Sequence, residues 1–156
     1  MDELKRYGDA PGSSFFLIRS AQSLYRERKY PQALELINRA IDRTSTLLPP
    51  YFLRSDIHIE MNNVPAAERD LTKIDQLLEE QGRFSEADEV QMHDLKVRIL
   101  IEKKQFKAAK QEVDRHAFMP KKVARRLLQQ LARAIGFNPS FADAELQRWA
   151  ARYTGS

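Results

Sequence analysis

The fold of this chain is decided by two stretches of sequence, KYPQA at residues 29–33 and NVPAA at residues 63–67, which align without a gap. Ala33 and Ala67 are therefore 34 residues apart. A period of this length is typical of proteins that repeat a helix-turn-helix unit, in which each unit buries its apolar face against its neighbours. The spacing predicts an all-α chain of stacked helical hairpins rather than an enzyme built around a single core.

Apolar residues on both sides of these turns recur at steps of three and four, the period of an amphipathic helix. We expect a first hairpin with helices at 15–28 and 31–44, a break at 47–50, and a second hairpin around the turn at 62–63. Pro31 and Pro65 suit the first turn of a helix, where the missing amide has no internal partner. The inward positions of the first helix are expected to be Phe15, Leu17, Ile18, Ala21, Leu24 and Tyr25.

A third hairpin is displaced along the chain. Gly82 suits the left-handed residue beyond a helix C-terminus. Ser85 and Asp88 then predict the start of a long helix over 86–104. The turn signature returns at 106–109, but Ala109 follows Ala67 by 42 residues. We therefore expect about eight inserted residues that lengthen the two facing helix ends around Gly82.

The last part of the chain departs from the repeat. Helices are expected over 121–135 and after the restart at 138–140, and this pair lacks the alanine and the aromatic residue of the repeat. Helical arrays often end in a divergent pair of this kind, which caps the array and covers its open end. The expected organisation is a flexible N-terminal arm at 1–13, repeats at 14–118 and C-terminal capping helices at 119–156.

The repeat positions resemble the tetratricopeptide-repeat family, in which small residues and a turn aromatic recur at fixed places. The first repeat matches with Ala21, Leu24, Tyr30, Ala33 and Ala40, the second with Tyr51, Ser55, Ala67 and Leu71, and the third with Leu100, Phe106 and Ala109. The resemblance covers about residues 15–116. It implies a right-handed α-solenoid of about three such hairpins plus the divergent C-terminal pair.

In that family the first helices of successive repeats line a concave groove that binds a peptide or a helix of a partner protein. The resemblance thus implies a protein-interaction module, such as an adaptor, a chaperone-like factor or an assembly factor, with no cofactor. Alternatively, the groove charges satisfy one another, or the N-terminal arm fills the groove. The matching groove positions hold Arg19, Gln22, Tyr25, Arg26, Asp56, Ile59 and Arg98.

Charge is unevenly distributed along the chain, and the C-terminal part suggests two alternative functions. Residues 1–95 carry 12 Lys+Arg against 17 Asp+Glu, whereas residues 96–156 carry 14 against 5. A basic half can serve nucleic-acid binding or regulation, although helical repeats often use such residues to solvate their outer faces. Self-association through the aromatic residues of the last helix pair is a further alternative. The basic residues concerned are Lys121, Lys122, Arg125, Arg126 and Arg133, and the aromatic ones Phe137, Phe141, Trp149 and Tyr153.

Catalytic and metal-binding motifs are scarce in the sequence. His58, His93 and His116 fall in three expected helices, and none is followed by a second histidine four residues later. We therefore expect packing roles for them, no metal site and no enzymatic activity. Cysteine is absent, which excludes disulfides and thiolate chemistry. No run approaches the roughly 20 apolar residues of a membrane span, and a cytoplasmic location is the expected default.

Overall fold

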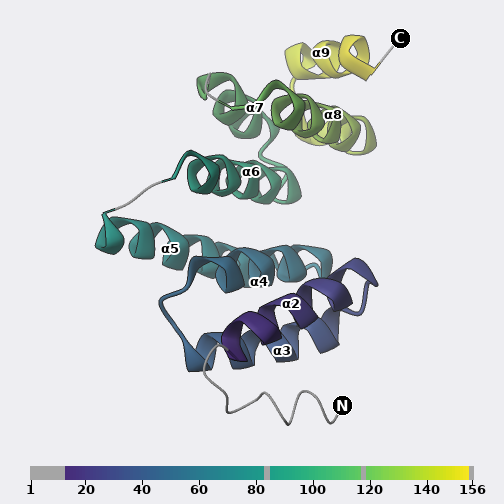
Figure 1. Ribbon diagram of the computed structural model, residues 1–156. Coiled ribbons are helices and arrows are strands. Elements are labelled where there is room, and N and C mark those ends of the chain that lie inside the picture. The colour runs from purple at the N-terminus through teal and green to yellow at the C-terminus, as the bar shows by residue number, and fades with distance from the viewer. Residues whose placement is uncertain (1–12, 83–84, 117–118, 155–156) are drawn as a thin grey trace. The chain divides into compact units, whose positions relative to one another are not determined.

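The computed structural model describes residues 13–82, 85–116 and 119–154, and these residues form α-helices joined by short turns, with no strand among them (Figure 1). The all-α prediction is confirmed. Of the expected arm at 1–13, only Ser13 is described, as the first residue of a helix, and the rest lies outside the described residues. The chain divides into two compact units between residues 83 and 84.

The first unit contains two helical hairpins. Helix α2 (Ser13–Arg26) packs on α3 (Tyr30–Arg43), and α4 (Leu48–Glu60) packs on α5 (Val64–Gln81). Helix α4 also contacts both α2 and α3, so the second hairpin covers the first through its leading helix (Figure 1). The buried cluster between them consists of Leu17, Ile18, Ala21, Ala33, Leu36, Ile37, Ala40, Leu53 and Ile57.

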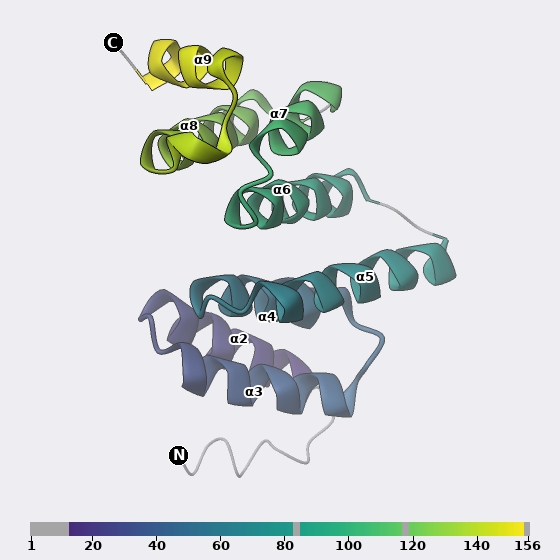
Figure 2. The ribbon, with the colours of Figure 1, turned by 180° about the vertical axis from the view of Figure 1, so that it is seen from behind.

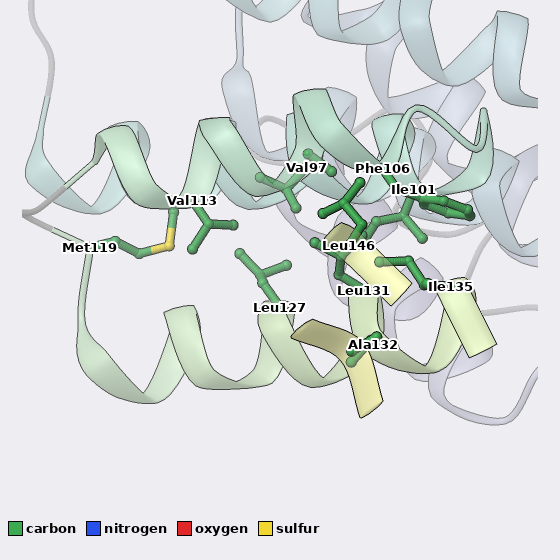
Figure 3. Packing of buried hydrophobic residues seen from close by; sticks show 12 residues of the cluster. Val97, Ile101, Phe106, Val113, Met119, Leu127, Leu131, Ala132, Ile135 and Leu146 are labelled. Atoms are coloured by element: carbon green, nitrogen blue, oxygen red, sulfur yellow. The ribbon is translucent and has the colours of Figure 1, made fainter. Parts of the chain in front are cut away.

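The second unit follows the same packing rule. Helix α6 (Glu86–Glu102) packs on α7 (Phe106–Arg115), and α8 (Lys121–Phe137) packs on α9 (Ala144–Thr154) after the short 3-10 helix η1 (Pro139–Phe141). Helix α8 contacts both α6 and α7, and Figure 2 shows the α8–α9 hairpin from behind. In Figure 3 the side chains of Leu127 and Leu131 on α8 point toward Val113 and Phe106 of α7.

The three expected repeat turns have one backbone conformation. Arg28, Asn62 and Lys104 are left-handed, with φ of 62°, 59° and 59°. The amide that follows each of them donates to the carbonyl five residues earlier, which is the bond of a Schellman motif: Lys29 N to Leu24 O at 2.9 Å, Asn63 N to His58 O at 2.7 Å, and Gln105 N to Leu100 O at 2.9 Å. Five residues beyond each left-handed residue lies a fully buried alanine: Ala33, Ala67 and Ala109. The prediction of three equivalent turns is confirmed.

The expected insertion is confirmed as well. Helix α5 has 18 residues against 14 in α3, and α6 has 17 against 13 in α4. Gly82 is left-handed at φ 61° and its amide donates to the carbonyl of Leu78 at 3.1 Å, ending α5. Ser85 Oγ accepts from the amide of Asp88 at 3.0 Å and starts α6. The extra residues therefore continue existing helices instead of forming a loop.

Two sequence-based expectations were wrong in detail. Residues 47–50 were expected to be a break, but α4 begins at Leu48 and includes Pro49 and Pro50, because the amides of a first helical turn need no internal partner. Phe15 was expected to face inward, yet its side chain is 61% exposed. It precedes the fully buried Leu17 by two positions, roughly 200° around the helix, and so lies on the opposite face.

Candidate functional site

A stripe of exposed side chains runs along α2 in the first unit. Arg19, Gln22 and Arg26 are all exposed, and their spacing of three and four residues places them on one helix face. Phe15, four residues before Arg19, extends this face with a large exposed ring. We call Phe15, Arg19, Gln22 and Arg26 the α2 stripe. Sequence analysis found its polar members but missed Phe15, which the helical pattern alone had assigned to the core.

The other expected groove residues of the first unit are less accessible. Tyr25 is half-buried, and its ring centroid lies 5.6 Å from that of Tyr30. Asp56 on α4 is half-buried, and Ile59 is only 8% exposed. Because α2 packs against α4, the stripe and Asp56 lie on neighbouring helices. Ile59 offers little surface to a ligand.

Arg98, the remaining expected groove residue, belongs to the second unit and takes part in an ion-pair network. Its Nε lies 3.5 Å from Asp94 Oδ2, and its side chain is 17% exposed. Arg126 Nη2 on α8 donates to Asp94 Oδ1 at 2.8 Å. Asp94 therefore holds α8 against α6 while balancing the charge of Arg98. A role in ligand binding would compete with this internal contact.

The basic residues of α8 remain a weaker candidate for binding nucleic acid. Lys121, Lys122, Arg125 and Arg133 are exposed, but the charge of Arg126 is engaged by Asp94. A gel shift at low and moderate salt tests this alternative, since phosphate contacts weaken steeply as salt rises.

A polar contact that sequence analysis missed ties the two hairpins of the first unit together. Arg54 on α4 donates to both carboxylate oxygens of Asp70 on α5, and its Nη1 donates to Asn38 on α3 at 2.9 Å. Asp70 is only 3% exposed. Buried carboxylates are tolerated when they are paired and hydrogen-bonded. We therefore interpret this contact as a structural one that joins three helices.

In the second unit, two histidines from different elements converge on one buried carboxylate. His93 Nδ1 on α6 lies 3.1 Å from Glu112 Oε1 on α7, and His116 Nε2, just beyond the end of α7, lies 2.9 Å from the same oxygen. The imidazole centroids are 3.5 Å apart, and the three side chains are 14%, 8% and 15% exposed. Lys96 Nζ approaches Glu112 Oε1 at 3.5 Å from the solvent side, its side chain 48% exposed.

Electrostatics determine the protonation of this His93–Glu112–His116 cluster. Burial alone would raise the pKa of Glu112, but the hydrogen bond from His116, the Lys96 charge and the hydrogen bond from His93 together bring it below its usual range. Burial lowers the pKa of His93, as does the neighbouring His116, although Glu112 opposes both. Glu112 is thus an anion at neutral pH that can only accept hydrogen bonds, so both ring nitrogens donate to it.

The cluster could have been found only in part from the sequence. Glu112 and His116 are four residues apart, a spacing that places two side chains on one side of a helix. His93 is 19 residues before Glu112, and its participation depends on how α6 lies against α7. His58, the third histidine, lies on α4 in the first unit.

No family model, curated protein or solved structure matches the chain. Within the described residues, none of the helices has the length and apolar character needed to cross a membrane.

Proposed function

We propose that this protein is a binding module rather than an enzyme, and that it holds a peptide segment or a helix of another protein against the α2 stripe. The observation that carries the proposal is the threefold recurrence of one hairpin turn, with a left-handed residue at the same position and a fully buried alanine five residues later. Helical repeats use the side chains of their leading helices as a binding surface, and in the first unit the leading helices α2 and α4 are in contact. An adaptor, a chaperone-like factor or an assembly factor would use such a surface.

The chemistry of the stripe indicates what it binds. Two arginines flank an amide side chain, and an exposed phenylalanine stands at the start of the helix. Arginine and aromatic residues dominate the energetics of protein interfaces. A segment that carries carboxylates beside one large apolar residue would match this arrangement, with the arginines supplying charge-assisted hydrogen bonds.

The proposal is tested with a displayed peptide library panned against the full chain. We expect recovered peptides to combine acidic residues with a large apolar residue. In fluorescence anisotropy, Arg26→Glu should weaken the binding of such a peptide by about tenfold or more, equivalent to about 1.4 kcal/mol. Arg43→Glu on α3 makes the same charge change at another exposed position and should leave affinity nearly unchanged. Equal affinities of wild type and Arg26→Glu would refute the assignment of the stripe.

Self-association is a second candidate, favoured by two exposed aromatic side chains. Phe137 at the end of α8 is 85% exposed and Phe141 in η1 is 60% exposed, whereas Trp149 and Tyr153 stack on each other and pack against the core of the second unit. An interface forms where such side chains belong to one contiguous apolar patch. Sedimentation of wild type and Phe137→Ser over a range of concentrations tests this candidate, because only the wild type should associate.

A further inference from the structure

We propose that His93, Glu112 and His116 form a binding site for a divalent transition-metal ion of the zinc class. Two imidazole nitrogens and one carboxylate are a ligand set that zinc uses in proteins. All three offer ligand atoms that lie within 4.8 Å of one another. The site lies inside the second unit and is independent of the α2 stripe, so its test stands apart from that of the proposed function.

The distances from Glu112 to the two imidazole nitrogens are close to those expected around such an ion, although the two rings must move apart to bind it. In a tetrahedral zinc site, ligand atoms about 2.1 Å from the metal are about 3.4 Å from one another. Here Glu112 Oε1 lies 3.1 Å from the His93 nitrogen and 2.9 Å from the His116 nitrogen. Both imidazole nitrogens are thus directed at the same carboxylate oxygen. For both nitrogens to bind an ion, each neutral imidazole must exchange, through solvent, to the tautomer that carries its proton on the other ring nitrogen. The two rings, whose centroids are now 3.5 Å apart, must also rotate away from each other, and metal–nitrogen bonds then replace the two hydrogen bonds.

The surroundings also suit a metal. Glu112 is buried, at 6% exposure, and comes from a helix whose other buried residues are Phe106, Ala109 and Val113, so its carboxylate is held in one place. Lys96 is the cation that now approaches this carboxylate, and its half-exposed side chain can move into solvent when a metal binds. Hard ions such as Mg²⁺ prefer oxygen ligands, so two nitrogen ligands select against them.

Three protein ligands leave a fourth position for water or for a group from another molecule, as in zinc sites that are not purely structural. In sequence the ligands span α6 and the end of α7, so a bound ion would also connect both helices of this hairpin. Binding should therefore stabilise the second unit in addition to occupying the site.

The test uses the full chain without a histidine tag, titrated with Zn²⁺ in a calorimeter, with Mg²⁺ as the comparison ion. We expect one Zn²⁺ per chain, no heat with Mg²⁺, and a raised melting temperature with Zn²⁺. His93→Gln and His116→Gln should each weaken Zn²⁺ binding by about 100-fold or more, since even partners outside the ligand shell are worth 10–100-fold. The matched control is His58→Gln, which removes a histidine from the other unit and should bind as the wild type does. Lys96→Met should bind at least as tightly as wild type.

A second measurement needs no variant and covers the case in which a ligand substitution unfolds the protein. Zn²⁺ is titrated into the wild type while the imidazole nitrogen resonances are followed by NMR. Selective shifts of His93 and His116, with His58 unchanged, support the site. No binding of Zn²⁺, shifts centred on His58, or equal affinities of wild type, His93→Gln and His116→Gln would each overturn the proposal.

Discussion

Arg54 on α4 donates hydrogen bonds to both carboxylate oxygens of Asp70 on α5. Its Nη2 lies 2.7 Å from Asp70 Oδ1, and its Nε lies 3.1 Å from each oxygen. The carboxylate is nearly inaccessible, whereas the arginine side chain is 24% exposed. Removing one partner of a buried ion pair leaves a charge without compensation, which costs far more than the pair contributes.

Arg54→Ala leaves the buried carboxylate of Asp70 without its partner and should therefore lower the free energy of unfolding of the first unit by about 3 kcal/mol. The measurement is urea denaturation followed by circular dichroism. Arg69→Ala, at an exposed site on α5, is the matched control and should change stability by no more than about 0.5 kcal/mol. Similar losses of unfolding free energy in both variants would show that the Arg54–Asp70 contact contributes no more to stability than an exposed charge does.

Glycine should stabilise the repeat turns. Arg28 and Lys104 adopt the left-handed conformation at φ 62° and 59°, which strains a side chain that bears a Cβ atom. Lys104→Gly relieves this strain and should raise the free energy of unfolding by about 0.5 to 1 kcal/mol, after allowance for the greater freedom of glycine in the unfolded chain. Lys103→Gly, at φ −80°, should destabilise the protein. A loss of stability in Lys104→Gly would contradict this account of the turn.

The repeated alanines should not tolerate larger residues. Ala33 has no exposed surface and lies at the contact of α3 with α2. Ala33→Leu adds methylene groups where the helices are in contact and should cost about 1 to 3 kcal/mol of stability. Gln32→Leu makes a similar apolar change at the exposed neighbouring position and should be nearly neutral. Thermal denaturation of the two variants would distinguish close packing from a general intolerance to leucine in this turn.

His58 should make the first unit less stable in mild acid. Burial lowers the pKa of His58, and Arg54 and Arg69 act in the same direction while Asp70 opposes them. The unfolded chain therefore binds a proton more readily than the folded one. The contribution of neutral His58 to the free energy of unfolding is fully present above the unfolded pKa of about 6.5. It is lost as the pH falls from there through the lower folded pKa.

The change in unfolding free energy between about pH 7.5 and pH 5.5 should thus be smaller in His58→Gln than in wild type. Urea titrations at both pH values provide the measurement. An unchanged pH dependence in the variant would mean that other groups, and not His58, cause the loss.

Much of the local structure follows from the sequence. The turn at Asn62 was predicted from its neighbours because turn residues, prolines and apolar spacing act within a few positions of one another. The insertion was likewise predicted from the displacement of Ala109 relative to Ala67. The outward orientation of Phe15 was not predicted, because an aromatic residue at the start of an amphipathic helix can face either inward or outward.

The helical hairpins and their shared turns could be predicted from the residues alone, because helix periodicity and turn chemistry are local properties of the chain. Which polar side chains contact one another depends instead on how the helices pack. The pairing of Arg54 with Asp70 and the convergence of His93 and His116 on Glu112 depend on the packing of whole helices. Side chains 16 or 19 residues apart come within hydrogen-bonding distance only after apolar burial has set the register of one helix against the next.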